Sequence, residues 1–176
     1  RQKAQQTLPL SLSLVLDLDL GEQLRFEGWG IQTMLSGAVR VRALPGQPLH
    51  IAGAVHSSDG RYAAYGQDLA ITQGVLAFQG PLDNPALDVI AIREHLPVQP
   101  GVHLTGSLQA PRLALIADAD IPEHDKLSWL ILGRPSAEAG QQKADADLLI
   151  AAASALLSRD QSFNMRQQLT SKLGID

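Results

Sequence analysis

The feature of this chain that most restricts its fold is a run of leucines near its start, spaced two residues apart. Seven leucines occupy every second position from Leu8 to Leu20. A period of two is typical of a β-strand, because successive side chains leave a pleated backbone on opposite faces. The run therefore predicts a long strand, with leucine alone on one face and mostly polar side chains, among them Asp17 and Asp19, on the other.

The leucine face has to be covered by something apolar. Burying one leucine side chain contributes about 1.5–3 kcal/mol, and a whole domain is stable by only about 5–15 kcal/mol. Three covers are open: a second layer in a β-sandwich or closed barrel, lipid around an outer-membrane barrel, or acyl chains in an incompletely closed sheet. Aromatic residues make up 4% of the chain, too few for the aromatic girdles of a membrane barrel. Periodicity does not decide between the other two covers.

Composition narrows the classes of function. The net charge of −4 and the absence of a basic cluster argue against nucleic acid as a partner. The chain has no cysteine, so it forms no disulfide or thiolate site. The longest apolar run, Leu148 to Leu157, is too short for a membrane-spanning helix of about 20 residues. Because the sequence opens at Arg1 without methionine, we expect a piece of a longer protein.

The first two-thirds of the chain, residues 1–118, read as β-strands. No helical pattern interrupts them, which disfavours a parallel α/β sheet and favours a curved, largely antiparallel sheet with an apolar inner face. Asp59-Gly60 and Gln73-Gly74 are predicted to be turns between strands. After Leu20, the expected strands lie around residues 24–26, 31–41, 49–55, 62–65, 69–71, 76–78, 87–92, 102–108 and 113–117.

Residues 119–176 are expected to form a helical tail. Asp120 and Glu123 have the spacing of a capping box, and Gly133 is the expected end of the first helix. A second helix is predicted over about 144–158 and a third over about 162–173. The tail is expected to pack over an edge or end of the sheet, with gating of the sheet as the alternative.

Chemistry-bearing residues do not assemble into a convincing active site. The five histidines lack the spacing of metal ligands and are expected at the surface. Asp17 and Asp19 are expected to solvate the outward face of the first strand and to discourage edge aggregation. Ser57 lies in an expected turn, outside any nucleophile-elbow motif. We therefore expect neither an enzyme nor a cofactor.

A longer segment is more specific. It runs from Gly60-Arg-Tyr-Ala-Ala-Tyr-Gly-Gln-Asp-Leu through Phe78-Gln-Gly-Pro-Leu-Asp-Asn-Pro-Ala-Leu87. Later pieces are Val102-His-Leu-Thr-Gly106, Pro111-Arg-Leu-Ala-Leu115 and Leu127-Ser-Trp-Leu-Ile-Leu-Gly133. In order and spacing, residues 26–176 resemble the C-terminal domain of the TamB family, which is related to bridge-like lipid transfer proteins.

The resemblance implies a periplasmic segment of a parent protein anchored in the inner membrane. It implies an open β-groove that carries phospholipid acyl chains toward the outer membrane, and a partner, the outer-membrane barrel protein TamA, that docks on a region beyond Asp176. The alternative function is a scaffold that receives unfolded outer-membrane protein strands by β-augmentation. Under the first hypothesis the predicted lipid-binding residues are Leu10, Leu12, Leu14, Leu16, Leu18, Leu35, Val39, Val41, Ile51, Val55, Leu76 and Phe78.

Overall fold

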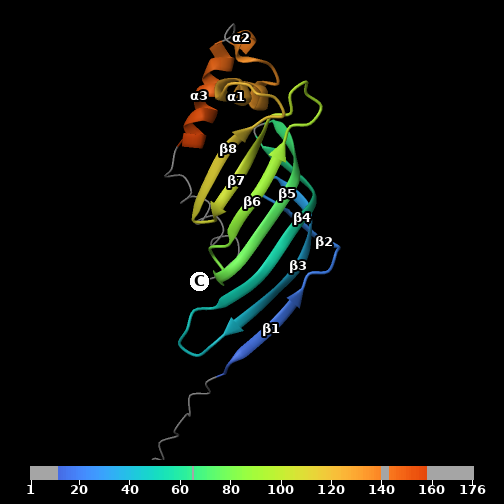
Figure 1. The fold of residues 1–176 in the computed structure, drawn as a ribbon, viewed down its shortest axis with the longest axis vertical. Helices are drawn as coiled ribbons and strands as arrows, with labels where there is room; N and C mark the ends of the chain where they lie inside the picture. Colours follow the sequence, from blue (N-terminus) through green and yellow to red (C-terminus); the bar gives the residue numbers. More distant parts are fainter. Residues whose placement is uncertain (1–11, 65, 140–142, 158–176) are drawn as a thin grey trace, which may run out of the picture.

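The fold is one antiparallel β-sheet followed by short helices (Figure 1). The computed structural model describes residues 12–64, 66–139 and 143–157. The strands are β1 (Leu14–Asp19), β2 (Leu24–Gly28), β3 (Ile31–Ala43), β4 (His50–Ala64), β5 (Gln67–Pro81), β6 (Ala86–Ile92), β7 (Gly101–Ser107) and β8 (Ala110–Ile116). The helices are α1 (Glu123–Leu132), α2 (Ser136–Ala139) and α3 (Lys143–Leu157).

The sheet is open. Its strand order is β1-β3-β4-β5-β6-β7-β8, with β2 also paired to β3. β1 pairs with the second half of β3 and β2 with the first half, both in antiparallel orientation. The chain therefore runs in the same direction before and after Gly21, and β1 and β2 together form one edge of the sheet. Within the described residues, β8 forms the opposite edge and does not pair with β1. The mainly β, antiparallel fold is thus confirmed, and the single open sheet is neither a two-layer sandwich nor a closed barrel.

The first strand is shorter than the leucine pattern suggests. β1 contains six residues, Leu14 to Asp19, and the backbone of Leu20 adds one further hydrogen bond to the Gly37 carbonyl at 2.9 Å. Leu12 precedes the strand, and Leu8 and Leu10 lie outside the described residues. The alternation therefore defines the faces of β1 correctly, but regular pairing covers only part of the run.

β4 and β5 are each one uninterrupted strand of fifteen residues, so both predicted turns are wrong. Asp59 has a φ of 50°, and the register between β3 and β4 shifts at this point, which is the mark of a β-bulge. The register between β5 and β6 shifts beside Gln73 in the same way. An Asp-Gly or Gln-Gly pair supplies backbone freedom for a bulge as readily as for a turn, and bulges bend and twist a sheet.

Glycines and bulky aliphatic residues alternate on one face across neighbouring strands. Gly37 lies opposite Val55 in the ladder, and Gly53 lies opposite Val39. Their φ angles are 125° and 134°, and a Cβ on Gly53 would lie 2.3 Å from the carbonyl oxygen of Ala38. These positions need glycine because the neighbouring backbone approaches too closely for any side chain.

Helix α1 begins differently from the sequence prediction. Its N-cap is Pro122, and no side chain caps it, so the Asp120–Glu123 capping box is wrong. Its predicted end is confirmed: Gly133 is left-handed, with φ 72°, and donates its N–H to the Trp129 carbonyl. α3 matches the second predicted helix, α2 was not predicted, and the third predicted helix lies outside the described residues.

The helices cover one end of the sheet (Figure 1). Leu130 of α1 forms a buried cluster with Leu69 of β5 and Ala91 of β6. Around this cluster pack Tyr62, Ile71, Val102, Leu115 and Ile131. α1 therefore packs on the sheet as expected for the tail.

Candidate functional site

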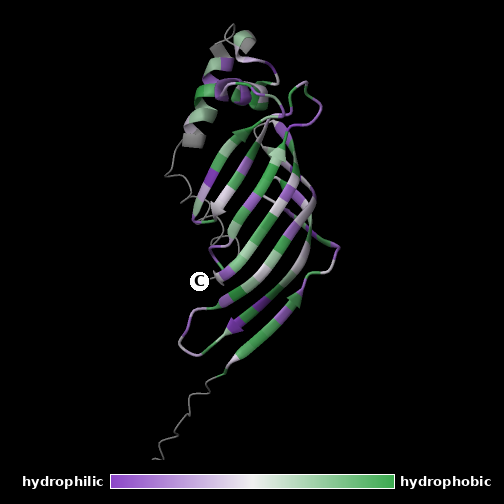
Figure 2. Ribbon diagram, viewed as in Figure 1, coloured by the Kyte–Doolittle hydropathy of each residue, from purple (hydrophilic) through white to green (hydrophobic). Residues whose placement is uncertain are grey.

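The ladder registers assign every strand residue to one of two faces. Directly paired residues share a face, and residues along a strand alternate. We call inner the face that carries Leu16, Val41, Ile51, Leu76 and Leu87, and outer the face that carries Asp17, Arg40, Ala52 and His56. Figure 2 shows the resulting mixture of apolar and polar positions along each strand.

The structure brings the sequence-predicted residues together on the inner face. Ten of the twelve lie in described strands, and all ten share this face: Leu14, Leu16, Leu18, Leu35, Val39, Val41, Ile51, Val55, Leu76 and Phe78. Leu12 lies just before β1 with 72% of its surface exposed, and Leu10 is outside the described residues. The predicted residues therefore lie on one face of the sheet, although Leu14 and Phe78 are 64 residues apart in the chain.

Paired residues form apolar rows that cross the strands. One row runs from Leu16 through Val41 to Ile51 over β1, β3 and β4. A second row contains Leu18, Val39, Gly53 and Phe78 and reaches β5. Neighbouring strands are about 4.8 Å apart, so each row places apolar side chains side by side, except at Gly53, where the backbone itself forms the surface. Such rows give a surface that is continuous in the direction perpendicular to the strands.

Exposure varies across the inner face. Ile51, Val55, Leu87 and Ala91, in the central strands, are buried. Leu14, Leu16 and Leu18 at the β1 edge keep 49%, 43% and 41% of their surface exposed, and Leu113 at the β8 edge keeps 43%. The described residues therefore leave apolar surface uncovered toward both edges of the sheet.

Sequence reasoning missed several residues of the inner face. Leu24, Leu104 and Leu113 belong to it through their pairing with Leu35, Val89 and Leu104. The signal that could have found them is the same period of two, since each lies in a strand that the sequence predicted. Thr33 was also missed: its buried hydroxyl bonds to Ser57 at 2.7 Å and to the Ser58 carbonyl at 2.9 Å, which satisfies a polar group on an apolar face beside the bulge.

The outer face carries charged side chains and ion pairs, interspersed with small or apolar residues such as Val15 and Ala52. Arg40 binds Asp17 with two hydrogen bonds of 2.6 and 3.2 Å, and this guanidinium lowers the pKa of the Asp17 carboxyl. His103 lies 2.8 Å from Asp88, which also accepts a bond from Gln73. Two pockets of about 410 and about 400 Å³ are lined mainly by outer-face and loop residues.

The described residues hold no group of three His, Cys, Asp or Glu side chains placed to bind a metal ion. None of the described helices combines the length and hydropathy that crossing a membrane requires. The chemical character of the candidate site is therefore that of an aliphatic surface, with hydrogen-bonding groups confined to its margins and the bulge.

The fold places the chain in a class of mainly β modules: one open antiparallel sheet with a partly uncovered aliphatic face and short helices at one end. The chain belongs to the TamB family: the model of the TamB C-terminal domain matches residues 1–176. It is similar to the translocation and assembly module subunit TamB of Haemophilus influenzae, with 30% identity over 131 residues. The match covers 72% of this chain and 10% of that protein, so the chain spans about a tenth of the length of this relative. The family predicted from the residues is thus confirmed.

Proposed function

We propose that this chain is a periplasmic segment of a translocation and assembly module subunit, and that its inner face carries phospholipid acyl chains. The observation that carries the proposal is the set of exposed leucines, Leu14, Leu16 and Leu18, at the edge of an otherwise apolar and open sheet face. Fully burying a leucine is worth about 1.5–3 kcal/mol, so these three half-exposed side chains leave roughly 2–4 kcal/mol unrealised. An acyl chain on this face would recover part of it.

The mechanism is passive. Methylene groups lie against the accessible part of the apolar rows, the exposed leucines of β1 and the partly buried Val39 and Val41 beside them, and movement along this edge exchanges one aliphatic contact for another. No bond is made or broken, so the proposal needs no catalytic residue and no cofactor. The polar outer face and strand ends leave headgroups in water. In the parent protein, which we propose is anchored in the inner membrane and works with TamA, such a surface would support outer-membrane assembly.

The test compares two adjacent residues of β1 that point in opposite directions. Leu16 lies on the inner face and Val15 on the outer face, and both are well exposed, at 43% and 58%. A photo-crosslinking amino acid is placed at each position in turn, in cells or with added phospholipid. We expect lipid adducts at position 16 to exceed those at position 15 several-fold. Equal labelling, or no lipid at either position, would contradict lipid binding by the inner face.

A second candidate function rests on the free edges of the sheet. Within the described residues, β8 pairs only with β7, and most of β8 is exposed. A free edge offers unpaired N–H and C=O groups to an extended strand. We therefore also propose, as the alternative, that an unfolded outer-membrane strand adds to this edge. Binding of a barrel-strand peptide that lipid does not compete with would favour this function over the first.

A further inference from the structure

The end of the sheet away from the helices carries exposed leucines on two neighbouring hairpins. Residues 44–49 join β3 to β4, and residues 82–85 join β5 to β6. Leu44 and Leu49 are the first and last residues of the first loop and are 42% and 41% exposed. Leu82, in the second loop, is 55% exposed. Between Leu44 and Leu49 the loop contains only proline, glycine and glutamine, so it holds no charge.

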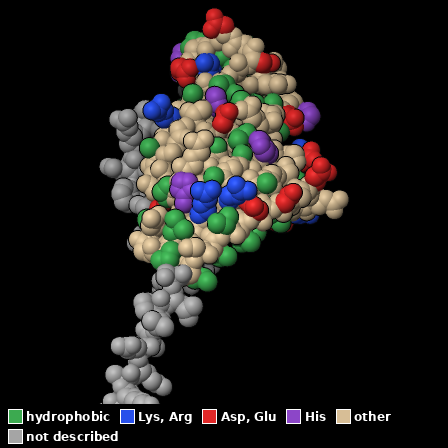
Figure 3. Space-filling model, turned by 60° about the horizontal axis from the view of Figure 1, so that its bottom comes forward, with side chains coloured by type: hydrophobic (Ala, Val, Ile, Leu, Met, Phe, Trp, Pro, Cys, Tyr) green, Lys and Arg blue, Asp and Glu red, His purple; other side chains and the backbone are tan. Residues whose placement is uncertain are grey.

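Two cationic or hydrogen-bonding side chains flank this uncharged loop. Arg42 and His50 lie directly opposite each other in the β3–β4 ladder, on the outer face. Within the described part of the chain neither side chain forms an ion pair or a side-chain hydrogen bond, whereas the nearby Arg40 is bound to Asp17. Figure 3, which brings this end forward, shows basic side chains gathered beside a histidine, with apolar side chains adjoining them.

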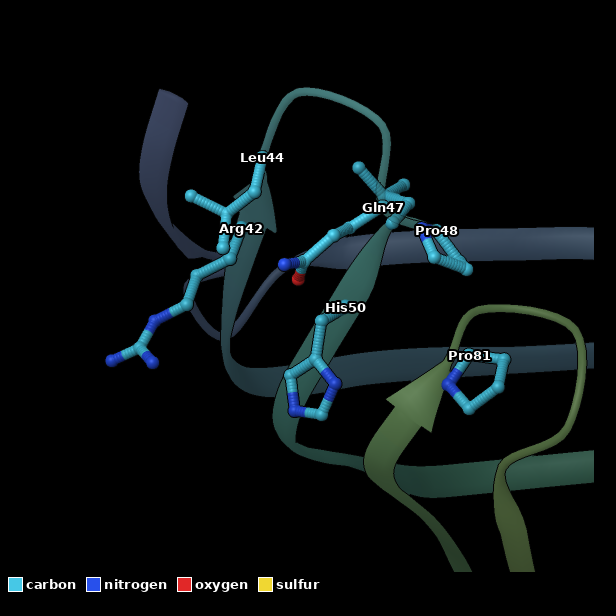
Figure 4. A pocket seen from close by; sticks show the side chains of 7 residues that line it. Arg42, Leu44, Gln47, Pro48, His50 and Pro81 are labelled. Atoms are coloured by element: carbon cyan, nitrogen blue, oxygen red, sulfur yellow. The ribbon is translucent and has the colours of Figure 1, made fainter. Parts of the chain in front are cut away.

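The same residues line a pocket. It has a volume of about 410 Å³ and is lined by Arg42, Leu44, Gln47, Pro48, Leu49, His50 and Pro81. In Figure 4 the Gln47 side chain reaches back from the loop toward the space between Arg42 and His50. A guanidinium offers a planar fork of N–H donors that matches phosphate oxygens, and an amide and an imidazole add further donors. The apolar wall and the donors therefore meet in one place.

We propose that this end of the sheet is a membrane-docking surface. Leu44, Leu49 and Leu82 enter the interfacial layer of a phospholipid bilayer, and Arg42, Gln47 and His50 hold the phosphate of an anionic headgroup. The uncharged β3–β4 loop, with a leucine at each end and Arg42 beside it, fits a lipid surface, because the aliphatic groups enter the acyl boundary while the cation stays at headgroup depth. The one acidic residue of the second loop, Asp83, accepts a hydrogen bond from Gln109. This inference does not depend on acyl chains binding to the inner face.

The test is sedimentation of the 176-residue chain with vesicles of phosphatidylcholine alone or mixed with phosphatidylglycerol. We expect the chain to bind the mixed vesicles more tightly, and the Leu44→Asp, Leu49→Asp double variant to bind both kinds at least about tenfold more weakly. Arg42→Glu is expected to weaken binding to the mixed vesicles alone, by a factor that shrinks as salt is raised. Circular dichroism of each variant checks that the sheet is intact.

Matched controls lie elsewhere in the fold. Leu148→Asp changes a leucine of α3 that is 47% exposed, and Arg112→Glu changes an arginine of β8 with no ion pair in the described structure; both should bind as the parent chain does. Leu16→Asp should keep docking, while lipid crosslinks from a photo-reactive amino acid at position 18, on the same face, should fall; this separates membrane docking from acyl-chain binding by the inner face. The proposal is overturned if the chain does not sediment with vesicles, or if the control variants weaken binding as much as the variants of the two loops do. It is also overturned if inorganic phosphate displaces the chain from vesicles completely, since that would indicate a site for a free anion.

Discussion

Asp17 and Arg40 face each other across β1 and β3, and Nε and Nη2 of the guanidinium donate hydrogen bonds of 2.6 and 3.2 Å to the two carboxylate oxygens. The pair lies on the outer face, directly behind the exposed leucines. A shift of one residue in an edge strand exchanges its two faces, so a paired charge on one face helps to keep the leucines on the other. The ion pair on the outer face thus helps to fix the register that places the leucines of β1 on the inner face.

The first prediction concerns the pH dependence of this pairing. The bond to Arg40 lowers the pKa of Asp17 in the folded protein. A lowered folded-state pKa stabilises the pairing at pH values above the ordinary aspartate range, and the contribution is lost as the pH falls through the folded-state value. We expect hydrogen-exchange protection of β1 amides to fall on acidification, and Asp17→Asn to show the lower protection already at pH 7. Asp68→Asn, which breaks an ion pair between β4 and β5, should leave β1 unchanged.

The second prediction concerns the contact between α1 and the sheet. Leu130 is 5% exposed and packs against Leu69 and Ala91. Leu130→Ala removes buried methyl groups and leaves a cavity, so we expect the free energy of unfolding to fall by about 2–5 kcal/mol. Leu148→Ala, at an exposed site of α3, should change it by less than about 0.5 kcal/mol. Urea unfolding followed by circular dichroism measures both, and equal effects would show that α1 does not share the sheet's core.

The third prediction concerns the end of α1. The Arg93 guanidinium, from the segment after β6, donates to the carbonyls of Trp129 and Leu130 at 3.4 and 3.0 Å. A cation at this position satisfies last-turn carbonyls and opposes the negative end of the helix dipole. We expect Arg93→Ala to reduce the free energy of unfolding by about 1–3 kcal/mol. Arg112→Ala is the control. An equal loss of unfolding free energy in that variant would show that the bonds from Arg93 to the last turn of α1 do not stabilise the fold.

Sequence alone could locate the inner face, because it depends only on the period of two. Leu14, Leu16 and Val41 fall on one face whatever the length of each strand, since register preserves alternation. The resemblance to the TamB family added the expectation of an open sheet, which periodicity did not supply. Both a sandwich and a single open sheet bury one face. The pairing of all eight described strands in one sheet excludes the sandwich, and β8, which pairs only with β7 among the described residues, leaves that sheet open.

Other features could not be read from the sequence. Asp59-Gly60 fits a hairpin turn and a bulge equally well, because a residue with positive φ, as Asp59 has here, can serve in either. The exposure of each inner-face residue depends on contacts between distant segments, so Ile51 is buried whereas Leu16 is exposed although both were predicted as lining. Helix α1 begins after Pro122 and not at Asp120, because the spacing of a capping box states only a local preference for where a helix starts.

The final prediction concerns a glycine at which the backbones of β3 and β4 approach each other closely. Gly53 has a φ of 134°, and an added Cβ would lie 2.3 Å from the Ala38 carbonyl oxygen, which is fixed in the ladder. Gly46, in the β3–β4 loop, also has a positive φ, 70°, but has open space around it. Both alanine variants carry the backbone strain of about 1–2 kcal/mol, and only Gly53→Ala adds the overlap. We therefore expect Gly53→Ala to cost at least about 3 kcal/mol, measured by urea unfolding, and Gly46→Ala to cost only the strain, about 1–2 kcal/mol. Similar losses at both positions would show that conformational strain, and not the close approach of two strands, explains glycine on the inner face.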